Sequence, residues 1–339
     1  MEVHNLTTIE ETSLYREWLL SHPDGSLWQS PEWAECLRAR GRTVRMYAVQ
    51  DGERICASAL VSIDRTAFNL SVWDCPRGPL WEDRGAVDLL LERIVRDATE
   101  DRALTVYLSP KRALPSLSFS LQESPRSEQP ESTRILDLTL EPEVILAQMK
   151  PKGRYNIGLS EKHGMRVRHS TETAAFMDLL HGTAARDGFR PGREADYAAF
   201  LQNLPGAFLL LAELPRASAD GKTHPRPIAG LLGCIWPSER KDARKTGIYY
   251  YGASSYEDRA LMAPYLLQWE AMRYCKAQGC TSYDLLGIAP TEDPDHPWAG
   301  VTSFKGKFGG EVVLYPPERQ IVLRPKALRL LRWKRRILG

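Results

Sequence analysis

The sequence predicts an α/β (α+β) protein with two tandem domains that repeat one order of elements: three strands, a helix and a further strand. Two observations predict this organisation. At 339 residues, the chain is long enough to form two hydrophobic cores. Segments with strand and helix periodicity also follow one another in the same order in both halves, without detectable sequence identity between them. We expect a first domain at residues 1–140, packed with the tail 318–339, and a second at 141–317.

The first half begins with two short helices and continues with the repeated unit. The second helix has the clearer start signal, because Ser30 is placed as its N-cap and Pro31 as its first residue. Asp51-Gly52, between two alternating segments, predicts a hairpin turn. The expected elements are helices at 12–21 and 31–40, strands at 44–50, 55–63 and 68–73, a helix at 85–101 and a strand at 103–108.

The second half is expected to repeat the unit after a linking region. Residues 110–133 are rich in Pro and Ser and predict a loop, whereas 142–163 indicates a helix interrupted near Pro151. Gly279 ends the helix of the repeated unit, as a residue that tolerates a positive φ should. The expected elements are strands at 207–214, 228–236, 247–255 and 282–286, with a helix at 259–276.

This order of elements is the core of the N-acetyltransferase (GNAT) fold and therefore predicts two GNAT-like domains. Acetyltransferases hold the pyrophosphate of CoA on backbone N–H groups of a glycine-rich turn at a helix N-terminus. The corresponding turns here, 76–79 and 254–259, lack a run of glycines, and Glu257 and Asp258 would repel phosphate. We therefore expect a GNAT scaffold that does not bind acetyl-CoA.

The composition narrows the possible functions. A net charge of +2 gives little overall attraction to nucleic acid, so a polyanion site must be a local patch. No run of about 18 apolar residues could cross a membrane, and the acidic, polar N-terminus does not resemble a secretory signal. The six cysteines form no Cys-x-x-Cys pair and the seven histidines show no ligand spacing, which predicts buried free thiols, a cytoplasmic location and no metal site.

Four short motifs in the second half are more specific than its composition. They read Tyr-Gly-Ala-Ser-Ser at 251–255, Leu-Leu-Gln-Trp-Glu at 266–270, Tyr-Asp-Leu-Leu-Gly-Ile at 283–288 and Phe-Lys-Gly-Lys-Phe-Gly-Gly at 304–310. In this order and spacing they resemble the Fem family (FemABX) of peptidoglycan-bridge aminoacyltransferases, which use aminoacyl-tRNA. Gln-Ser-Pro-Glu-Trp at 29–33 and Lys-Pro-Lys-Gly-Arg-Tyr-Asn-Ile at 150–157 extend the resemblance. It implies two GNAT-like domains and, without a long heptad segment, the compact subtype that lacks a coiled-coil arm.

The resemblance implies a reaction. An amino acid is transferred from aminoacyl-tRNA to the side-chain amine of a peptidoglycan stem peptide, carried by UDP-MurNAc-pentapeptide or lipid II. Because the ester is already activated, no cofactor, metal or protein nucleophile is required. Catalysis then depends on the placement of the two substrates and on a positive charge close to the oxyanion. Lys305 occupies the family position for that charge, and the alternative is a lysine in a Gly-rich turn that extends into water.

The resemblance also assigns residues to the acceptor. Arg193 and Tyr197 match the family's acceptor-binding arginine and tyrosine, and their spacing predicts a shared helical face. Tyr251 and Tyr256 are both candidates for a site tyrosine, with Tyr251 favoured, and Phe304 completes this part of the acceptor set.

Two further positions are open. In the first domain, the family often places a phosphate-binding lysine four residues after the tryptophan of its Gln-Ser-x-x-Trp motif. Leu37 stands there in this chain, and Arg38 beside it is the candidate substitute. In the second domain, Asp284 is either a structural acceptor for backbone N–H groups or a base.

Two basic segments are candidates for binding polyanions. Lys150, Lys152 and Arg154 surround an aromatic residue, and Lys307 joins them as a candidate for tRNA binding; a solvated basic face is the alternative. The tail 324–339 carries seven Lys and Arg and no acid, with apolar residues among them. Such a segment suits anionic lipid or RNA, or forms an ordinary surface helix.

We therefore expect a cytoplasmic, monomeric aminoacyltransferase with a possible contact to the inner face of the membrane. Two alternatives stay open: an enzyme that uses the same tRNA chemistry to build a peptide natural product, and a catalytically silent module that binds tRNA or a membrane surface. The intact Phe-Lys-Gly-Lys-Phe-Gly-Gly segment favours an enzyme, because binding alone would not need it.

Overall fold

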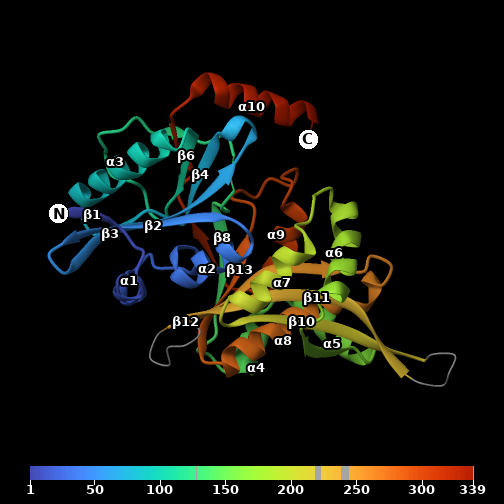
Figure 1. Ribbon diagram of the computed structural model, residues 1–339. Coiled ribbons are helices and arrows are strands. Elements are labelled where there is room, and N and C mark those ends of the chain that lie inside the picture. The colour runs from blue at the N-terminus through green and yellow to red at the C-terminus, as the bar shows by residue number, and fades with distance from the viewer. Residues whose placement is uncertain (127, 218–222, 238–243, 339) are drawn as a thin grey trace. The chain divides into compact units, whose positions relative to one another are not determined.

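The structure is a computed structural model that describes residues 1–126, 128–217, 223–237 and 244–338 (Figure 1). The chain forms two compact units, Met1–Glu131 together with Tyr315–Gly339, and Ser132–Leu314. The sequence placed the first limit near residue 140. Strand β8 (Ser132–Asp137) nevertheless pairs with β13 and β14, so it belongs to the sheet of the second unit.

The first unit contains a mixed sheet with the order β1-β2-β3-β4-β6-β15-β7, and β5 pairs with β3. Strands β4 and β6 run parallel, with helix α3 between them in the chain, which gives the predicted order of three strands, a helix and a strand. The strands are β1 Glu2–Asn5, β2 Thr43–Asp51, β3 Arg54–Arg65, β4 Ser71–Pro76, β5 Leu80–Trp81, β6 Ala103–Ser109, β7 Gln122–Glu123 and β15 Arg319–Val322. The helices are α1 Ile9–Ser21, η1 Leu27–Gln29, α2 Pro31–Ala39, η2 Ala67–Asn69, α3 Arg84–Glu100 and α10 Pro325–Leu338.

Local sequence chemistry sets where these elements begin. Helix α2 begins as predicted, because the Ser30 hydroxyl accepts a hydrogen bond from a backbone N–H of the first turn. Helix α1 begins earlier than expected, since Thr8 and Glu11 form a capping box that sequence reasoning had missed. Strand β4 begins later than expected, because Phe68 and Asn69 have φ of 64° and 55°, which a sheet does not accommodate.

Helices α3 and α10 pack on opposite faces of the first sheet. Adjacent residues of β4 point to opposite faces, as the two-residue period of a strand requires. Trp73 belongs to the core beneath α3, together with Leu90 and Ile94, whereas Val72 belongs to the smaller core beneath α10, together with Leu328.

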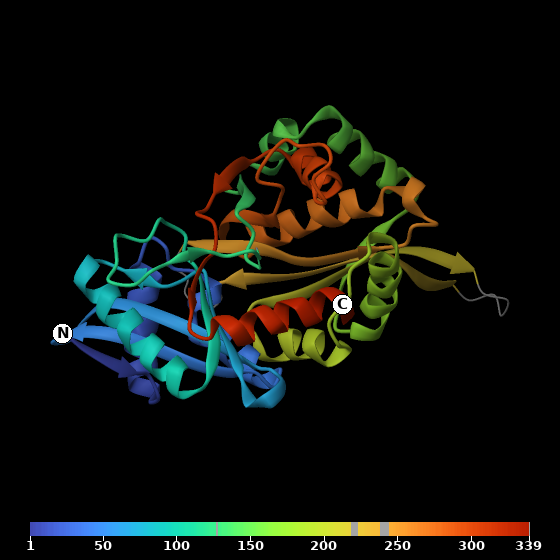
Figure 2. The same ribbon diagram turned by 90° about the horizontal axis from the view of Figure 1, so that it is seen from above.

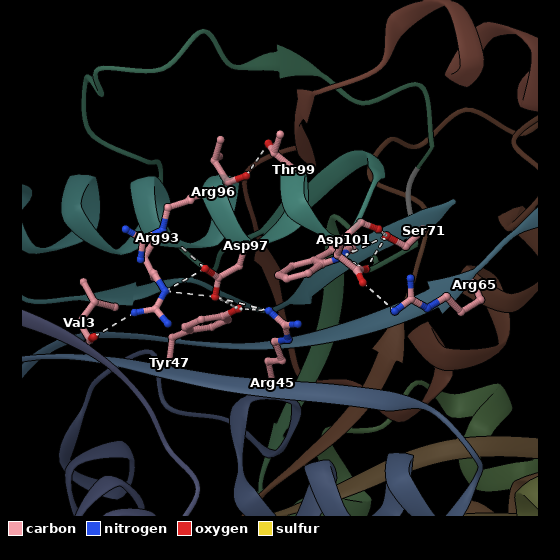
Figure 3. A network of polar contacts seen from close by, with 12 residues as sticks. Val3, Arg45, Tyr47, Arg65, Ser71, Arg93, Arg96, Asp97, Thr99 and Asp101 are labelled. Atoms are coloured by element: carbon pink, nitrogen blue, oxygen red, sulfur yellow. Dashed lines mark hydrogen bonds and ion pairs between the residues drawn. The ribbon is translucent and has the colours of Figure 1, made fainter. Parts of the chain in front are cut away.

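Two carboxylates near the end of α3 attach the helix to the sheet (Figure 3). Asp97 accepts hydrogen bonds from the Tyr47 hydroxyl of β2 at 3.0 Å and from Arg93 Nε, one turn earlier, at 2.9 Å. Asp101, which follows the helix, accepts from Trp73 Nε1 of β4 at 3.1 Å. The position of α3 is therefore fixed by polar contacts as well as by its buried apolar face.

The C-terminal part of the chain returns to complete the first sheet. Strand β15 lies between β6 and β7, and Glu318, immediately before it, is 2% exposed. The Arg126 guanidinium donates to Glu318 at 2.8 Å and to Asp74 of β4 at 2.7 Å, and its Cζ lies 3.5 Å from the Tyr107 ring centroid. One arginine of the linking loop thus neutralises two carboxylates in the interior of the unit.

The second unit contains a sheet with the order β14-β8-β13-β12-β11-β10-β9. Strands β10, β11 and β12, helix α8 and strand β13 repeat the order of the first unit, as predicted, and β12 and β13 again run parallel. The strands are β8 Ser132–Asp137, β9 Arg166–Ser170, β10 Ala207–Ala217, β11 Thr223–Trp236, β12 Lys245–Ser254, β13 Cys280–Gly287 and β14 Glu311–Leu314. The helices are α4 Pro142–Gln148, α5 Pro151–Lys162, α6 Thr173–Asp187, α7 Glu194–Asn203, η3 Arg259–Leu261, α8 Ala263–Ala277, α9 Ala299–Lys305 and η4 Gly306–Phe308.

Helices cover both faces of the second sheet, with α5 and α8 on one face and α6 and α7 on the other (Figure 2). The predicted helix at 142–163 is two helices that break before Pro151, as the restriction on the residue before a proline implies. The predicted helix at 259–276 begins only at Ala263, because Met262 has φ of 55°. Across the described residues, no helix is long and apolar enough to span a bilayer.

Candidate active site

The candidate site lies where the two parallel strands of the second sheet separate. Strands β12 and β13 pair from Lys245 and Cys280 as far as Ile248 and Asp284. Beyond this point their ladder ends, although β12 continues to Ser254 and β13 to Gly287. Backbone groups and side chains at the ends of the two strands therefore do not pair with each other and can interact with other groups or with a ligand.

Lys305 is placed at this separation. It is the last residue of α9, and its ammonium donates a hydrogen bond to the Gly287 carbonyl at the end of β13, at 2.7 Å. Its Nζ lies 5.5 Å from the centroid of the Tyr249 ring on β12. Only 7% of the residue is exposed, so the alternative of a lysine in a Gly-rich turn that extends into water is wrong.

The burial of Lys305 changes its acidity. Removal from water disfavours the charged form and lowers its pKa from 10.5 to about 8, while the negative charge of Asp284 acts in the opposite direction. At pH 7 the side chain is therefore mostly a cation, and it is half neutral about one pH unit higher. A poorly solvated cation is the group that can interact strongly with a developing oxyanion.

Asp284, whose charge acts on this cation, is held in place by hydrogen bonds. Its Oδ1 accepts hydrogen bonds from the Thr133 hydroxyl of β8 and from the Leu286 backbone N–H, the latter at 2.8 Å. Leu286 has φ of 54°, an uncommon conformation for a residue with a branched side chain, and the hydrogen bond to Asp284 stabilises it. Asp284 is thus a structural acceptor, which was one of its two predicted roles, and it also keeps a negative charge near Lys305.

A row of buried polar side chains lies next to the site, and sequence reasoning missed it. The Tyr283 hydroxyl donates to Gln268 Oε1 of α8 at 3.0 Å. Burial raises the pKa of Tyr249 to about 12, and a polar interaction with Gln268 acts in the opposite direction. A Cβ on Gly252 would lie 1.9 Å from the Tyr249 hydroxyl, so this glycine is required for the tyrosine to fit. The available signal was a glutamine in an otherwise apolar stretch of helix, which has to be paired when buried.

A β-bulge divides the three consecutive tyrosines of β12. In the pairing with β11, Leu232 faces Tyr251 and Gly233 faces Tyr249, so Tyr250 is the extra residue. Tyr249 consequently packs toward the α8 side, whereas the Tyr250 and Tyr251 rings contact α7 on the other face. Tyr251 is 36% exposed and its ring lies 5.4 Å from that of Tyr197.

Arg193 and Tyr197 do not share a helical face, so that prediction is wrong. Arg193 is the N-cap of α7 with an extended backbone, and its side chain is 75% exposed and ion-paired with Asp196 at 3.0 Å. Tyr197 is 4% exposed, and its hydroxyl accepts from the Gly192 N–H at 3.1 Å. The pair differs in exposure because one residue precedes the helix and the other lies within it.

The remaining aromatic candidates have different surroundings. Tyr256 follows β12 and is 57% exposed, with the Arg259 and Arg186 guanidinium groups 4.3 and 5.7 Å from its ring centroid. Phe304 packs edge-on against Tyr265 of α8, with ring centroids 5.1 Å apart. Phe304 therefore anchors the segment that carries Lys305, a contact consistent with a supporting role.

The basic candidates for tRNA binding meet at the N-terminus of α5. The Lys150 N–H donates to the Lys307 carbonyl at 3.0 Å, and a Cβ on Gly153 would lie 2.6 Å from that oxygen, so the two segments approach closely. Lys150 and Lys152 are exposed and Lys307 is half-buried. Arg154 differs, because its guanidinium hydrogen-bonds the Ala147 carbonyl at 3.0 Å and the Met149 carbonyl, at the end of α4.

Arg38 lies in the first unit. Its guanidinium pairs with Glu35, one turn earlier on α2, and both residues line a cleft of about 450 Å³ between α1, α2 and β2. Arg16 and Arg45 also line this cleft, so it is rich in guanidinium groups. Sequence reasoning identified Arg38 but not the cleft.

The two turns that correspond to CoA-binding loops are occupied by the chain's own groups. In the second unit, Arg226 donates to both oxygens of Asp258 at 2.7 and 2.8 Å and holds the pKa of that carboxyl at about 2. In the first unit, the Gln29 amide donates to the Pro76 carbonyl at 2.6 Å, and a Cβ on Gly78 would lie 2.6 Å from it. In the described part of the chain, no group of three or more His, Cys, Asp or Glu could hold a metal ion.

Comparison with known proteins supports the resemblance. The family model described as the FemAB family matches residues 10–129, 119–225 and 241–331. A lipid II:glycine glycyltransferase of Staphylococcus haemolyticus is 24% identical over 384 residues, covering 91% of this chain and 90% of the relative. The crystal structure of FemX has a TM-score of 0.78 at 19% identity and covers 97% of this chain and 99% of that one. A tandem GNAT protein from the clavulanic acid biosynthesis pathway has a TM-score of 0.54 at 13% identity, over 95% and 98% of the two chains. These likenesses confirm the predicted fold of two GNAT-like domains.

Proposed function

Because this chain belongs to the FemAB family, we propose that it is an aminoacyltransferase that moves an amino acid from aminoacyl-tRNA to the side-chain amine of a peptidoglycan stem peptide. The relative from Staphylococcus haemolyticus acts, by its name, on lipid II, and this supports a lipid II-type acceptor here; UDP-MurNAc-pentapeptide carries the same stem peptide. The product is one unit of an interpeptide bridge. The enzyme acts as a monomer in the cytoplasm, at the inner face of the membrane when its acceptor is lipid-linked.

The observation that carries the proposal is the buried Lys305 ammonium where β12 and β13 separate. The acceptor amine attacks the ester carbonyl carbon of aminoacyl-tRNA, and a C–N bond forms as the carbonyl oxygen becomes an oxyanion. The oxyanion then re-forms the carbonyl as the C–O bond to the ribose breaks, and the ribose oxygen takes the proton that the amine loses. Lys305 stabilises the oxyanion, and the Gly287 carbonyl and the Tyr249 ring position its ammonium.

Comparison of the two lysines of the Phe-Lys-Gly-Lys-Phe segment tests this role. Lys305→Met should lower the single-turnover rate at saturating tRNA by about 10²–10³-fold, the usual loss for one oxyanion donor, with little change in substrate affinity. Lys307→Met is the matched control, because Lys307 is two residues away and half-buried, and it should leave that rate unchanged. If Lys305→Met weakened tRNA binding and left the saturated rate intact, Lys305 would be a phosphate contact instead.

The two exposed lysines at the start of α5 and the half-buried Lys307 beside them are assigned to the donor RNA. Lys150, Lys152 and Lys307 come from two segments joined by a backbone hydrogen bond, and Lys152 lies 5.1 Å from the Tyr155 ring, which is 61% exposed. Each phosphate contact contributes a slope of roughly −0.7 to −0.9 to the dependence of log K on log salt. Replacing the three lysines by Gln should flatten that dependence for tRNA and leave acceptor affinity unchanged; a salt dependence identical to the wild type would rule the assignment out.

The acceptor phosphates are assigned to Arg193, with the exposed Tyr251 ring beside Tyr197 as part of the same surface. Arg193 is 75% exposed, and its planar fork can bind phosphate through two hydrogen bonds, which lysine cannot reproduce. Arg193→Lys should therefore raise the KM for the acceptor while tRNA affinity stays constant. Arg190→Lys, three residues away, is the control, and an unchanged acceptor KM in Arg193→Lys would contradict the assignment.

A further inference from the structure

We propose that helix α10 is a membrane-surface helix, and that its outward face docks the protein on a bilayer containing anionic lipid. The inference deepens the proposed function and rests on it for one point only, the choice of a lipid-linked acceptor. The two faces of α10 differ in what they contact.

The inward face of α10 is fully engaged with the first sheet. Leu328 is 3% exposed and belongs to a small core with Val72, Leu104 and Tyr107. The Arg332 guanidinium donates to the Tyr107 hydroxyl at 3.2 Å and to a glutamine of β15 at 2.7 Å. These contacts fix which side of the helix faces the protein and which side faces away from the sheet.

The outward face combines apolar and cationic side chains. Leu330 and Trp333 are 61% and 62% exposed, and their spacing of three residues places them on one side of the helix. Lys326 and Arg329 are exposed on the same helix. Because the whole segment 324–339 has seven Lys and Arg and no acid, no carboxylate of its own neutralises these charges. Figure 1 shows α10 as one continuous helix, and residues three or four positions apart on such a helix lie on the same side.

A bilayer surface matches both properties of this face. Tryptophan prefers the interface between lipid and water, and an exposed leucine beside it gains by entering the acyl region. Cations near an anionic leaflet each strengthen binding about fivefold at physiological ionic strength. An RNA backbone would attract the cations but would gain nothing from the exposed leucine. An ordinary surface helix does not usually leave a large aromatic side chain and a leucine side by side in water.

The test measures cosedimentation of the full-length protein with vesicles of phosphatidylcholine alone or with 30% phosphatidylglycerol, in about 0.1 M salt. We expect binding only to the anionic vesicles. Lys326→Gln with Arg329→Gln should weaken it about 25-fold, and Leu330→Ser with Trp333→Ser at least tenfold. The matched controls are Arg84→Gln with Lys162→Gln, both exposed and outside α10, and Phe68→Ser, which is 84% exposed; they should bind like the wild type.

Two results would overturn the inference: no binding of the wild type to anionic vesicles, or equal binding by the α10 variants. Weaker tRNA binding by these variants, with vesicle binding intact, would assign the helix to RNA. Transfer to soluble UDP-MurNAc-pentapeptide should be unaffected by the α10 variants, whereas transfer to lipid II in anionic vesicles should slow. If the wild type binds vesicles but transfers nothing, the proposed function fails and the membrane helix stands; transfer without vesicle binding gives the opposite outcome.

Discussion

The pH dependence of transfer depends on the acidity of Lys305. With its pKa lowered by burial to about 8, about one side chain in ten is neutral at pH 7, half at pH 8 and about nine in ten at pH 9. If the ammonium stabilises the oxyanion, its contribution to the rate should fall about tenfold per pH unit above 8. A lysine that acted as a base would produce a rise through the same range.

Asp284→Asn should shift the pH range over which the rate falls, which is the falling limb of the pH–rate profile. The negative charge of Asp284 raises the pKa of Lys305, so its removal should lower that pKa further and move the falling limb to lower pH. Asparagine keeps an oxygen that can accept from the Leu286 N–H, so the local backbone is retained. The structural change is therefore small compared with the electrostatic one.

The assay is single-turnover transfer at saturating tRNA, measured from pH 6 to pH 9.5 for the wild type and for Asp284→Asn. Deprotonation of the acceptor amine raises both rates equally, so the ratio of the two rates isolates Lys305. Lys305→Arg supplies a charge that does not titrate and should have no falling limb. A ratio that is constant with pH would refute the reasoning.

Three other predictions follow from packing. Gly252→Ala should lower activity and Tm, because the new Cβ meets the Tyr249 hydroxyl, and adding Tyr249→Phe should restore part of both. Arg126→Met should cost about 3–5 kcal/mol of unfolding free energy at pH 7 by leaving buried carboxylates unpaired. Burial raises the pKa of Asp74 to about 6, so its carboxyl is mostly neutral at pH 5 and mostly charged at pH 7. Less buried charge is therefore left unpaired at pH 5, and urea unfolding should show a smaller loss of stability in Arg126→Met at pH 5 than at pH 7. Arg154→Met should lower stability by about 0.5–1.5 kcal/mol by uncapping α4, with unchanged tRNA affinity in a filter-binding assay. Equal deficits at the two pH values, or lost tRNA affinity in Arg154→Met, would contradict these assignments.

Local signals predicted much of the fold. The N-cap at Ser30, the hairpin turn at Asp51-Gly52 and the break before Pro151 all depend on backbone preferences of one or two residues, and each was found where expected. The repeated order of strands and helix was also predicted, because the spacing of apolar residues indicates which face of each element is buried. The short helix α9, which ends at Lys305, was not among the predicted elements, since it is stabilised by aromatic packing rather than by propensity.

The site was harder to predict than the fold. The resemblance located Lys305, but its burial depends on where two parallel strands stop pairing, which is a property of the whole sheet. The bulge at Tyr250 likewise reverses which face Tyr251 occupies, and a period of two cannot show this. The role of Gln268 is evident only in the folded structure, because the two tyrosines with which it interacts lie on different strands.

The return of β15 to the first sheet has a consequence for synthesis of the protein. Strand β15 inserts between β6 and β7, so the edge of β6 stays unpaired until residues beyond 318 leave the ribosome. The second unit, by contrast, is continuous from Ser132 to Leu314 and can complete its sheet first. An exposed strand edge in a nascent chain invites misassociation. Chains that stall or are cleaved before β15 should therefore aggregate through the first unit while the second unit remains folded.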